Sequence, residues 1–216
     1  MRRYAIIVAG GKGTRMNSDV PKQFLLIDGE PIIVRTIRVF LKADSGITPI
    51  IVIPKESIGD WNLIKERHLA KVKVIDAVGG ETRTSSVLSG LQQITDDGVV
   101  AIHDAVRPYV SPKIILNSFE SAEIHGSGVV CIPLKDSIRE LTGGDTSVSR
   151  NRNDFVLVQT PQTFIVSKIK DAYRKVGDHA SHTDDASVYE GAGYKVAMVT
   201  GSYANIKITT PEDLKA

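Results

Sequence analysis

A glycine-rich loop near the N-terminus is the first place in this sequence where residue types and spacing could do chemistry. The run Ala9-Gly10-Gly11-Lys12-Gly13-Thr14-Arg15 follows a short apolar stretch, and Lys22 comes soon after it. Glycines let backbone N–H groups approach phosphate oxygens closely, and Arg15 and Lys22 can supply positive charge. The loop is neither a Walker A motif nor a dinucleotide fingerprint, because glycine follows Lys12 and the third fingerprint glycine is missing. It predicts a phosphate site, with a plain tight turn as the alternative.

The distribution of charge supports a compact anionic ligand. The chain has a net charge of +2, but residues 1–42 contain eight Lys or Arg against three acidic residues. A DNA-binding domain usually spreads its basic excess over a broad face and carries a recognition motif. Here the excess is local and accompanies the glycine loop. We therefore expect a phosphate-bearing small molecule and no nucleic acid.

Composition excludes several other classes of protein. The 216 residues are 42% hydrophobic and 24% charged, which is typical of a globular protein and not of a disordered one. The single cysteine, Cys131, excludes an internal disulfide and every multi-cysteine metal site. Apolar runs reach strand length only, and the first begins at Tyr4 with no leader before it. We expect a cytoplasmic protein with no membrane partner.

Apolar stretches of strand length alternate with amphipathic, helix-like segments along most of the chain. Strands are predicted at residues 4–9, 49–53, 73–77, 99–103, 129–132 and 195–199. Helices are predicted at residues 31–43, 60–69, 84–94, 112–125, 166–176 and 185–191. This alternation predicts an α/β fold, with a mostly parallel, doubly wound, Rossmann-like sheet in a single domain spanning residues 1–216. Ligands bind such sheets beyond the carboxyl ends of the strands, where the loops at 10–15, 79–86 and 104–107 would meet.

The alternation breaks between residues 135 and 160. Residues 135–141 alternate polar and apolar side chains, Gly143-Gly144 predicts a turn, and residues 155–158 look extended again. These features predict a two-stranded ribbon that projects as an arm at about residues 135–159. Isolated ribbons are only marginally stable, so we expect the arm to pack against a second subunit.

The motifs, taken in order, resemble those of the cytidylyltransferases that activate sugar-alcohol phosphates. The glycine loop followed by Pro21-Lys22-Gln23 is similar to the nucleotide-binding signature of that family. Further similar segments lie at residues 79–87, 103–108, 133–138, 159–162, 183–187 and 205–214. The resemblance implies transfer of CMP from CTP to a sugar-alcohol phosphate. By the same resemblance, the segment Thr183-Asp184-Asp185-Ala186-Ser187 favours 2-C-methyl-D-erythritol 4-phosphate as the acceptor. Ribitol 5-phosphate is the alternative acceptor, and an inactive nucleotide-binding regulatory module is the non-enzyme alternative.

The chemistry of such a reaction explains which residues it would need. A phosphate monoester carries a charge of roughly −1.5 to −2 at pH 7, so it is already a nucleophile and needs no general base. The difficulty is repulsion between like charges, which cations and positioning must overcome. By resemblance, the catalytic cations are Arg15, Lys22 and Lys207.

The resemblance also implies the binding residues. The nucleotide would contact Ala9, Gly10, Gly11, Gly80, Glu81, Ser86, Asp104 and Ala105. The acceptor would contact Arg107, Ser137, Arg152, Thr160 and Thr183. Ser137 and Arg152 would come from a neighbouring subunit's arm, which makes the expected protein a homodimer.

A divalent cation, Mg²⁺, is the implied cofactor. It would be held mainly by the phosphates of CTP, with Asp104 as a weak protein ligand. Ala204 stands where many relatives of the family have an acidic residue, so a second protein carboxylate is in doubt. His103 beside Asp104 could indicate a metal-dependent phosphohydrolase, but the other histidines have no supporting spacing.

Overall fold

The structure, a computed structural model, describes residues 1–10, 20–177 and 182–215. A seven-stranded sheet forms its centre, in the order β11-β7-β10-β6-β1-β4-β5. The strands are β1 (Arg3–Val8), β4 (Thr48–Ile53), β5 (Ile75–Val78), β6 (Val99–Asp104), β7 (Ser127–Pro133), β10 (Val156–Ile165) and β11 (Met198–Thr200). Among the strands of this sheet that the structure describes, only β10 runs antiparallel to its neighbours, which are β6 and β7. The predicted α/β fold with a mostly parallel sheet is therefore confirmed.

Helices cover both faces of the sheet. They are α1 (Ile32–Ala43), α2 (Ile58–Leu69), α3 (Arg83–Gln92), α4 (Pro112–His125), α5 (Val166–Val176) and α6 (Asp185–Gly191). Side chains of β1 alternate between two cores: Ala5 and Ile7 pack with α1, α2 and α4, whereas Ile6 and Val8 pack with α3, α5 and α6. This period of two explains why the buried strands are apolar throughout.

Side-chain caps define where the helices near the sheet edge begin. Thr82 caps α3 in a reciprocal pair of hydrogen bonds with Ser85, and Asp184 caps α6 in the same way with Ser187. Helix α4 begins with Ser111 as its cap and ends at Gly126, whose φ of 92° suits glycine. The caps at Thr82 and Asp184 therefore fix where the loops before α3 and α6 end.

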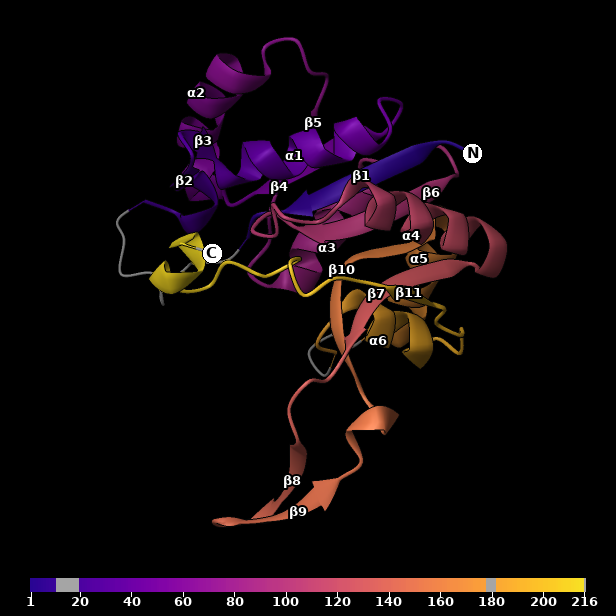
Figure 1. Cartoon of the computed structure of the whole chain (residues 1–216). Coiled ribbons are helices and arrows are strands. Elements are labelled where there is room, and N and C mark those ends of the chain that lie inside the picture. The colour runs from indigo at the N-terminus through magenta and orange to yellow at the C-terminus, as the bar shows by residue number, and fades with distance from the viewer. Residues whose placement is uncertain (11–19, 178–181, 216) are drawn as a thin grey trace.

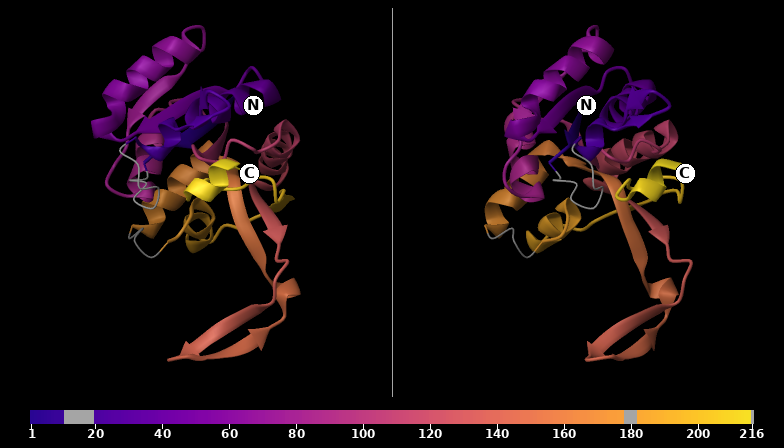
Figure 2. Two further views of the ribbon diagram at one scale, coloured as in Figure 1. Left: turned by 60° about the vertical axis from the view of Figure 1, so that its left-hand side comes forward. Right: turned by 90° about the vertical axis from the view of Figure 1, so that its left-hand side faces the viewer.

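The predicted two-stranded ribbon is present and projects from the body of the molecule (Figures 1 and 2). It consists of β8 (Ile138–Gly143) and β9 (Thr146–Arg150), joined through Gly143 and Gly144 at φ values of 107° and 54°. The base of the arm exposes a run of apolar side chains from Phe155 to Val158, and its tip exposes Leu141. Apolar groups so arranged favour a covering partner.

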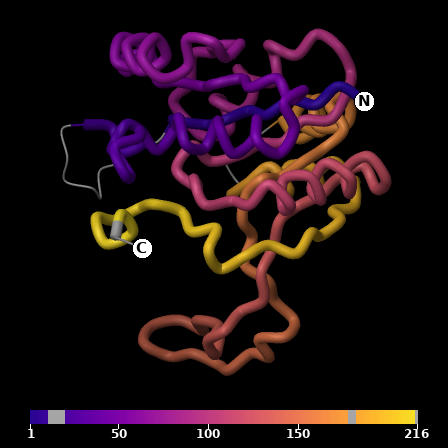
Figure 3. The backbone as a smooth tube through the Cα atoms, turned by 45° about the horizontal axis from the view of Figure 1, so that its top comes forward, coloured from indigo at the N-terminus to yellow at the C-terminus, as the bar shows by residue number. Residues whose placement is uncertain are grey.

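The C-terminal segment returns across the molecule towards the first turn of α1, as the backbone trace in Figure 3 shows. Ile208 is wholly buried against Ile27, Ile32 and Val106, and its N–H donates to the Val106 carbonyl at 2.9 Å. The segment therefore has a fixed path, although residues 203–210 form neither helix nor strand.

Some predicted elements differ from the structure. The short hairpin of β2 (Leu26–Ile27) and β3 (Glu30–Pro31) was not predicted, because strands of two residues carry no periodic pattern. Strand β10 is ten residues long, whereas only residues 155–158 were predicted to be extended, since its second half contains Pro161 and polar residues. The last strand begins at Met198 and not at residue 195. In the part of the chain that the structure describes, no helix has the length and apolarity needed to cross a bilayer.

Candidate active site

A pocket of about 260 Å³ lies where β6 ends beside the middle of β10. Its lining residues come from five segments that are distant in sequence. They are Arg83, Asp104, Arg107, Val158, Gln159, Thr160, Gln162, Thr183, Asp184 and Lys207. The structure thus brings together five of the residues expected from the sequence: Asp104, Arg107, Thr160, Thr183 and Lys207.

Asp104, the last residue of β6, is the buried centre of this pocket. Lys207 Nζ lies 3.0 Å from its Oδ2, Arg107 Nε lies 3.4 Å from the same oxygen, and Arg83 Nε lies 3.6 Å from Oδ1. Burial alone would raise the pKa of Asp104, but Lys207, Arg83 and Arg107 outweigh it and hold that pKa well below its usual range. The carboxylate stays ionised and keeps the three cations close to one another.

Lys207 is positioned through its buried neighbour Asn205. The Asn205 side-chain Nδ2 donates to the Thr160 carbonyl at 2.9 Å, and the backbone carbonyl of Asn205 accepts from Arg107 Nη1 at 2.8 Å. These bonds join the C-terminal segment to both β10 and the loop after β6. An ammonium group on an irregular segment is thereby held at a defined place, while 40% of its side chain stays exposed.

Thr160 and His103 form a buried pair behind Asp104. His103 Nε2 lies 3.2 Å from the Arg107 carbonyl oxygen, which can only accept, so Nε2 carries the ring proton. Nδ1, 3.0 Å from Thr160 Oγ1, then accepts the threonine proton, and Oγ1 accepts from the Asp104 N–H at 3.1 Å. The Thr160 hydroxyl can therefore serve a ligand only as an acceptor.

His103 has both of its ring nitrogens engaged within the protein. It is wholly buried, and burial lowers the pKa of its imidazole to about 4, so the ring is neutral at physiological pH. Within residues 1–10, 20–177 and 182–215, no group of three or more His, Cys, Asp or Glu side chains is arranged to hold a metal ion. The phosphohydrolase reading of His103 and Asp104 has no support in this part of the chain.

The loops after β1 and β5 meet at the start of α3. A Cβ atom on Gly10 would lie 3.0 Å from Ser86 Oγ, and one on Gly80 would lie 2.6 Å from the Ser85 Cβ. Gly80 N donates to Ser86 Oγ at 3.2 Å. Such close approach explains glycine at both positions and brings three of the expected nucleotide-binding residues, Gly10, Gly80 and Ser86, into contact.

Other expected nucleotide-binding residues lie beside these loops. Ala9 N donates to the Val52 carbonyl, and Ala105 N donates to the Val8 carbonyl, each at 3.0 Å, so both continue the strand ladder past its end. Glu81 is exposed on the loop before α3. Two predicted residues, Gly11 and Arg15, lie outside the described residues.

The remaining predicted residues are not beside the pocket. Lys22 lies in a short 3₁₀ helix, η2 (Lys22–Phe24), on the approach to β2. Ser137 and Arg152 are exposed in the arm, where Arg152 donates to the Lys135 carbonyl. Neither Ser137 nor Arg152 is among the described residues that line this chain's own pocket.

Sequence reasoning gave no role to Arg83 or Gln162. Gln162 Oε1 accepts from Ala186 N at 2.9 Å, and Nε2 donates to Asp184 Oδ2 at 2.8 Å, which anchors the start of α6 to β10. Arg83 is the first residue of α3, where a positive charge opposes the helix dipole. A cation at that position signals an acidic partner, and this signal could have identified Arg83.

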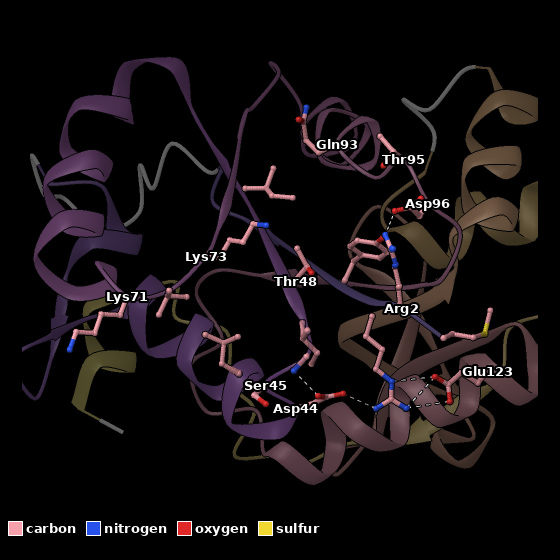
Figure 4. Close-up of a pocket in the computed structure, with 18 residues that line it drawn as sticks. Arg2, Asp44, Ser45, Thr48, Lys71, Lys73, Gln93, Thr95, Asp96 and Glu123 are labelled. Carbon is pink, nitrogen blue, oxygen red and sulfur yellow. Dashed lines mark hydrogen bonds and ion pairs between the residues drawn. The ribbon is translucent and has the colours of Figure 1, made fainter.

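A second, larger concavity of about 980 Å³ lies at the opposite edge of the sheet, at the amino ends of β1 and β4 (Figure 4). Its arginines are already paired with acids: Arg2 with Asp96, and Arg3 with Asp44 and Glu123. None of the site residues predicted from the sequence is among its described lining residues. Size alone is therefore a poor guide to the site in this molecule.

Comparison with known proteins decides the family. A family model for 2-C-methyl-D-erythritol 4-phosphate cytidylyltransferase matches residues 4–216. The chain belongs to this family. It is 44% identical over 216 residues to the 2-C-methyl-D-erythritol 4-phosphate cytidylyltransferase of Phocaeicola vulgatus, covering all of this chain and 97% of that one. The enzyme of the same name from Bacteroides fragilis is 45% identical with the same coverage.

Solved structures of this family share the fold. The 4-diphosphocytidyl-2C-methyl-D-erythritol synthase of Anaerococcus prevotii aligns with a TM-score of 0.84 at 27% identity, covering 99% of this chain and 94% of that one. The 2-C-methyl-D-erythritol 4-phosphate cytidylyltransferase of Francisella tularensis aligns with a TM-score of 0.80 at 29% identity, covering 100% and 97%. The family resemblance seen in the motifs is confirmed, and the chain is a nucleotidyltransferase enzyme.

Proposed function

We propose that this enzyme transfers CMP from CTP to 2-C-methyl-D-erythritol 4-phosphate, giving 4-diphosphocytidyl-2-C-methyl-D-erythritol and pyrophosphate, a step of non-mevalonate isoprenoid biosynthesis. The observation that carries this proposal is the cluster of Arg83, Arg107 and Lys207 around Asp104 at the carboxyl edge of the sheet. In a chain of the cytidylyltransferase family, such a cluster suits the meeting of phosphates from two substrates.

The reaction needs charge neutralisation more than proton transfer. An oxygen of the acceptor phosphate forms a bond to the α-phosphorus of CTP, and the bond from that phosphorus to the bridging oxygen of pyrophosphate breaks. Arg107, Thr160 and Thr183 are proposed to bind the acceptor, and Lys207 to stabilise the α-phosphate. Arg15 and Lys22 are proposed to neutralise the triphosphate.

Lys207 can exchange one anionic partner for another. In the structure its ammonium group pairs with Asp104, yet two-fifths of the side chain faces solvent. A phosphate that enters the pocket can take this ammonium group while Arg107 and Arg83 still neutralise Asp104. The cation is thus positioned before the substrate binds, which reduces the cost of reorganisation.

Mg²⁺ is the proposed cofactor, and the donor set limits how it can be held. Asp104 is the nearest candidate ligand, but three cations lie around its carboxylate, which disfavours a divalent ion bound by protein alone. Ala204 offers no carboxylate. The residues present fit an ion held mainly by the phosphates of CTP, with Asp104 as its protein ligand, where it would neutralise phosphate charge.

A homodimer through the arm is also part of the proposal. The arm's base exposes Phe155, Leu157 and their neighbours, and Ser137 and Arg152 stand away from the pocket of their own chain. A partner's arm would both cover the apolar surface and bring Ser137 and Arg152 to the acceptor. A cytoplasmic location remains a prediction.

Phosphorus NMR of the reaction products tests the proposed activity. CTP, Mg²⁺ and 2-C-methyl-D-erythritol 4-phosphate are incubated with the enzyme, and the α-phosphate resonance of CTP is followed. We expect it to be replaced by a coupled pair from a diphosphodiester, with free pyrophosphate. Unchanged CTP would contradict the proposal and would favour an inactive nucleotide-binding module.

A further inference from the structure

A chain of paired charges, two buried carboxylates and one part-buried guanidinium group, links the pocket to the helices behind it. Asp185, the first residue of α6, has no exposed surface. Its Oδ2 accepts from Arg83 Nη2 at 2.7 Å, and its Oδ1 accepts from the Tyr173 hydroxyl at 2.6 Å. Arg83 Nε in turn lies 3.6 Å from Asp104 Oδ1. One guanidinium group therefore bridges a carboxylate on α6 and the carboxylate at the centre of the pocket.

The position of Arg83 is not explained by helix stability. As the first residue of α3 it opposes the helix dipole, and burial of its side chain would by itself lower its pKa. Asp185 and Asp104 more than compensate and raise that pKa. Buried ion pairs are weak evidence for stability, and their best-attested role is to specify one arrangement over others.

Arg83 lies between the two halves of the proposed site. On one side, the loop that carries Gly80 leads directly into α3, and Asp104 lies against the same guanidinium group. On the other side, Thr183 directly precedes Asp184, the cap of α6, and stands two residues from the partner of Arg83, Asp185. A planar guanidinium group can contact two carboxylates from different nitrogens, whereas a lysine ammonium group is a single point of charge.

We propose that Arg83 is a positioning residue which, through its pairing with the buried Asp185, holds Asp104 and the Thr183 loop in register for the reaction. The inference rests on the proposed function. This positioning role differs from direct substrate binding, because Asp185, the partner of Arg83, is fully buried and cannot touch a ligand in this structure.

A double-mutant cycle with Arg83→Lys and Asp185→Asn tests this role. kcat and the acceptor KM are measured by pyrophosphate release, with the melting temperature of each variant. We expect each single variant to raise the acceptor KM and lower kcat, reducing kcat/KM by about ten-fold or more. The kcat/KM of the double variant should fall below that of the poorer single variant by no more than about two-fold, because the two residues act as one unit.

Two results would overturn the positioning role. One is Asp185→Asn with wild-type kcat and KM, whether or not its melting temperature falls, since that result makes the pair purely structural. The other is a double variant whose fold-reduction in kcat/KM equals the product of the fold-reductions in the two single variants. A wild-type enzyme that releases no pyrophosphate would instead contradict the proposed function.

Milder and matched variants guard against misfolding. Tyr173→Phe removes one hydrogen bond to Asp185 and leaves the ion pair, so we expect a rise of a few-fold in the acceptor KM. If Asp185→Asn does not fold, wild-type kinetics in Tyr173→Phe and Arg83→Lys together would overturn the inference. Lys65→Gln breaks the ion pair of Lys65 with Asp76, away from the pocket, and should leave kcat and KM unchanged.

Discussion

Asp104 shows how a single carboxylate can organise a site whose substrates are anions. It is buried, stays ionised, and gathers Arg83, Arg107 and Lys207 where free arginines and lysines would repel one another. Without this carboxylate the three cations would repel one another more strongly in one small pocket. The same contact leaves Lys207, the most exposed of the three cations, available to a phosphate.

Substitution of Lys207 should separate catalysis from stability. In Lys207→Ala, Arg83 and Arg107 still neutralise Asp104, so the melting temperature should change by only a few degrees. Loss of a positioned charge at the reacting phosphate should lower kcat by about 100-fold or more. Steady-state kinetics and thermal unfolding of the same preparation check this, with Lys42→Ala, an exposed lysine in the last turn of α1, as the control. Equal losses of kcat in both variants would contradict the assignment.

His103 predicts the direction in which stability depends on pH. Its pKa is about 4 in the folded protein and about 6.5 in an unfolded chain, so the unfolded state binds more protons between these values. The contribution of His103 is therefore complete above pH 6.5 and is lost as the pH falls towards 4, by up to about 3 kcal/mol. Urea unfolding at pH 7.0, 5.5 and 4.5 measures the effect.

Two variants isolate this contribution. His103→Gln should flatten the pH dependence of the unfolding free energy, whatever its stability at pH 7. Ile124→Ala, at an exposed and non-titratable position near the end of α4, should keep the wild-type slope. If the unfolding free energy of His103→Gln depends on pH as steeply as that of the wild type, groups other than His103 determine this dependence and the prediction is wrong.

At the scale of elements, local signals were sufficient where a helix has clear ends. Helix α4 was predicted to the residue, because Ser111, Pro112 and Gly126 mark its boundaries. Strand β10 was only partly predicted, since its polar second half is buried by contacts with β6, α6 and the C-terminal segment. No local pattern reveals such contacts, and although the position of Arg83 signals an acidic partner, it does not show that this partner is Asp185.

The arm is the element whose apolar surface most needs a partner. Leu157 is half exposed at its base, so Leu157→Glu should leave the fold of a single chain stable but disfavour a dimer. Sedimentation velocity should show a dimer for the wild type and a monomer for this variant. Leu63→Glu, on the exposed side of α2, is the control and should remain dimeric. A monomeric wild type would contradict assembly through the arm.

At the scale of the whole molecule, the proposed site combines one chain's pocket with the other chain's arm. If so, Arg152→Ala and Lys207→Ala damage different halves of each site, and a mixed dimer contains one intact site. Unfolding and refolding an equal mixture of the two inactive variants should restore about a quarter of wild-type activity. No recovery, with mixed dimers shown by mass spectrometry, would place both residues in a site formed by one chain.

The choice of acceptor is the most direct test of the proposed function. Initial rates of pyrophosphate release are measured with CTP and Mg²⁺, offering 2-C-methyl-D-erythritol 4-phosphate and ribitol 5-phosphate in parallel. We predict a kcat/KM for the methylerythritol phosphate that is higher by about 100-fold or more. A preference for ribitol 5-phosphate, or no pyrophosphate release with either acceptor, would contradict it.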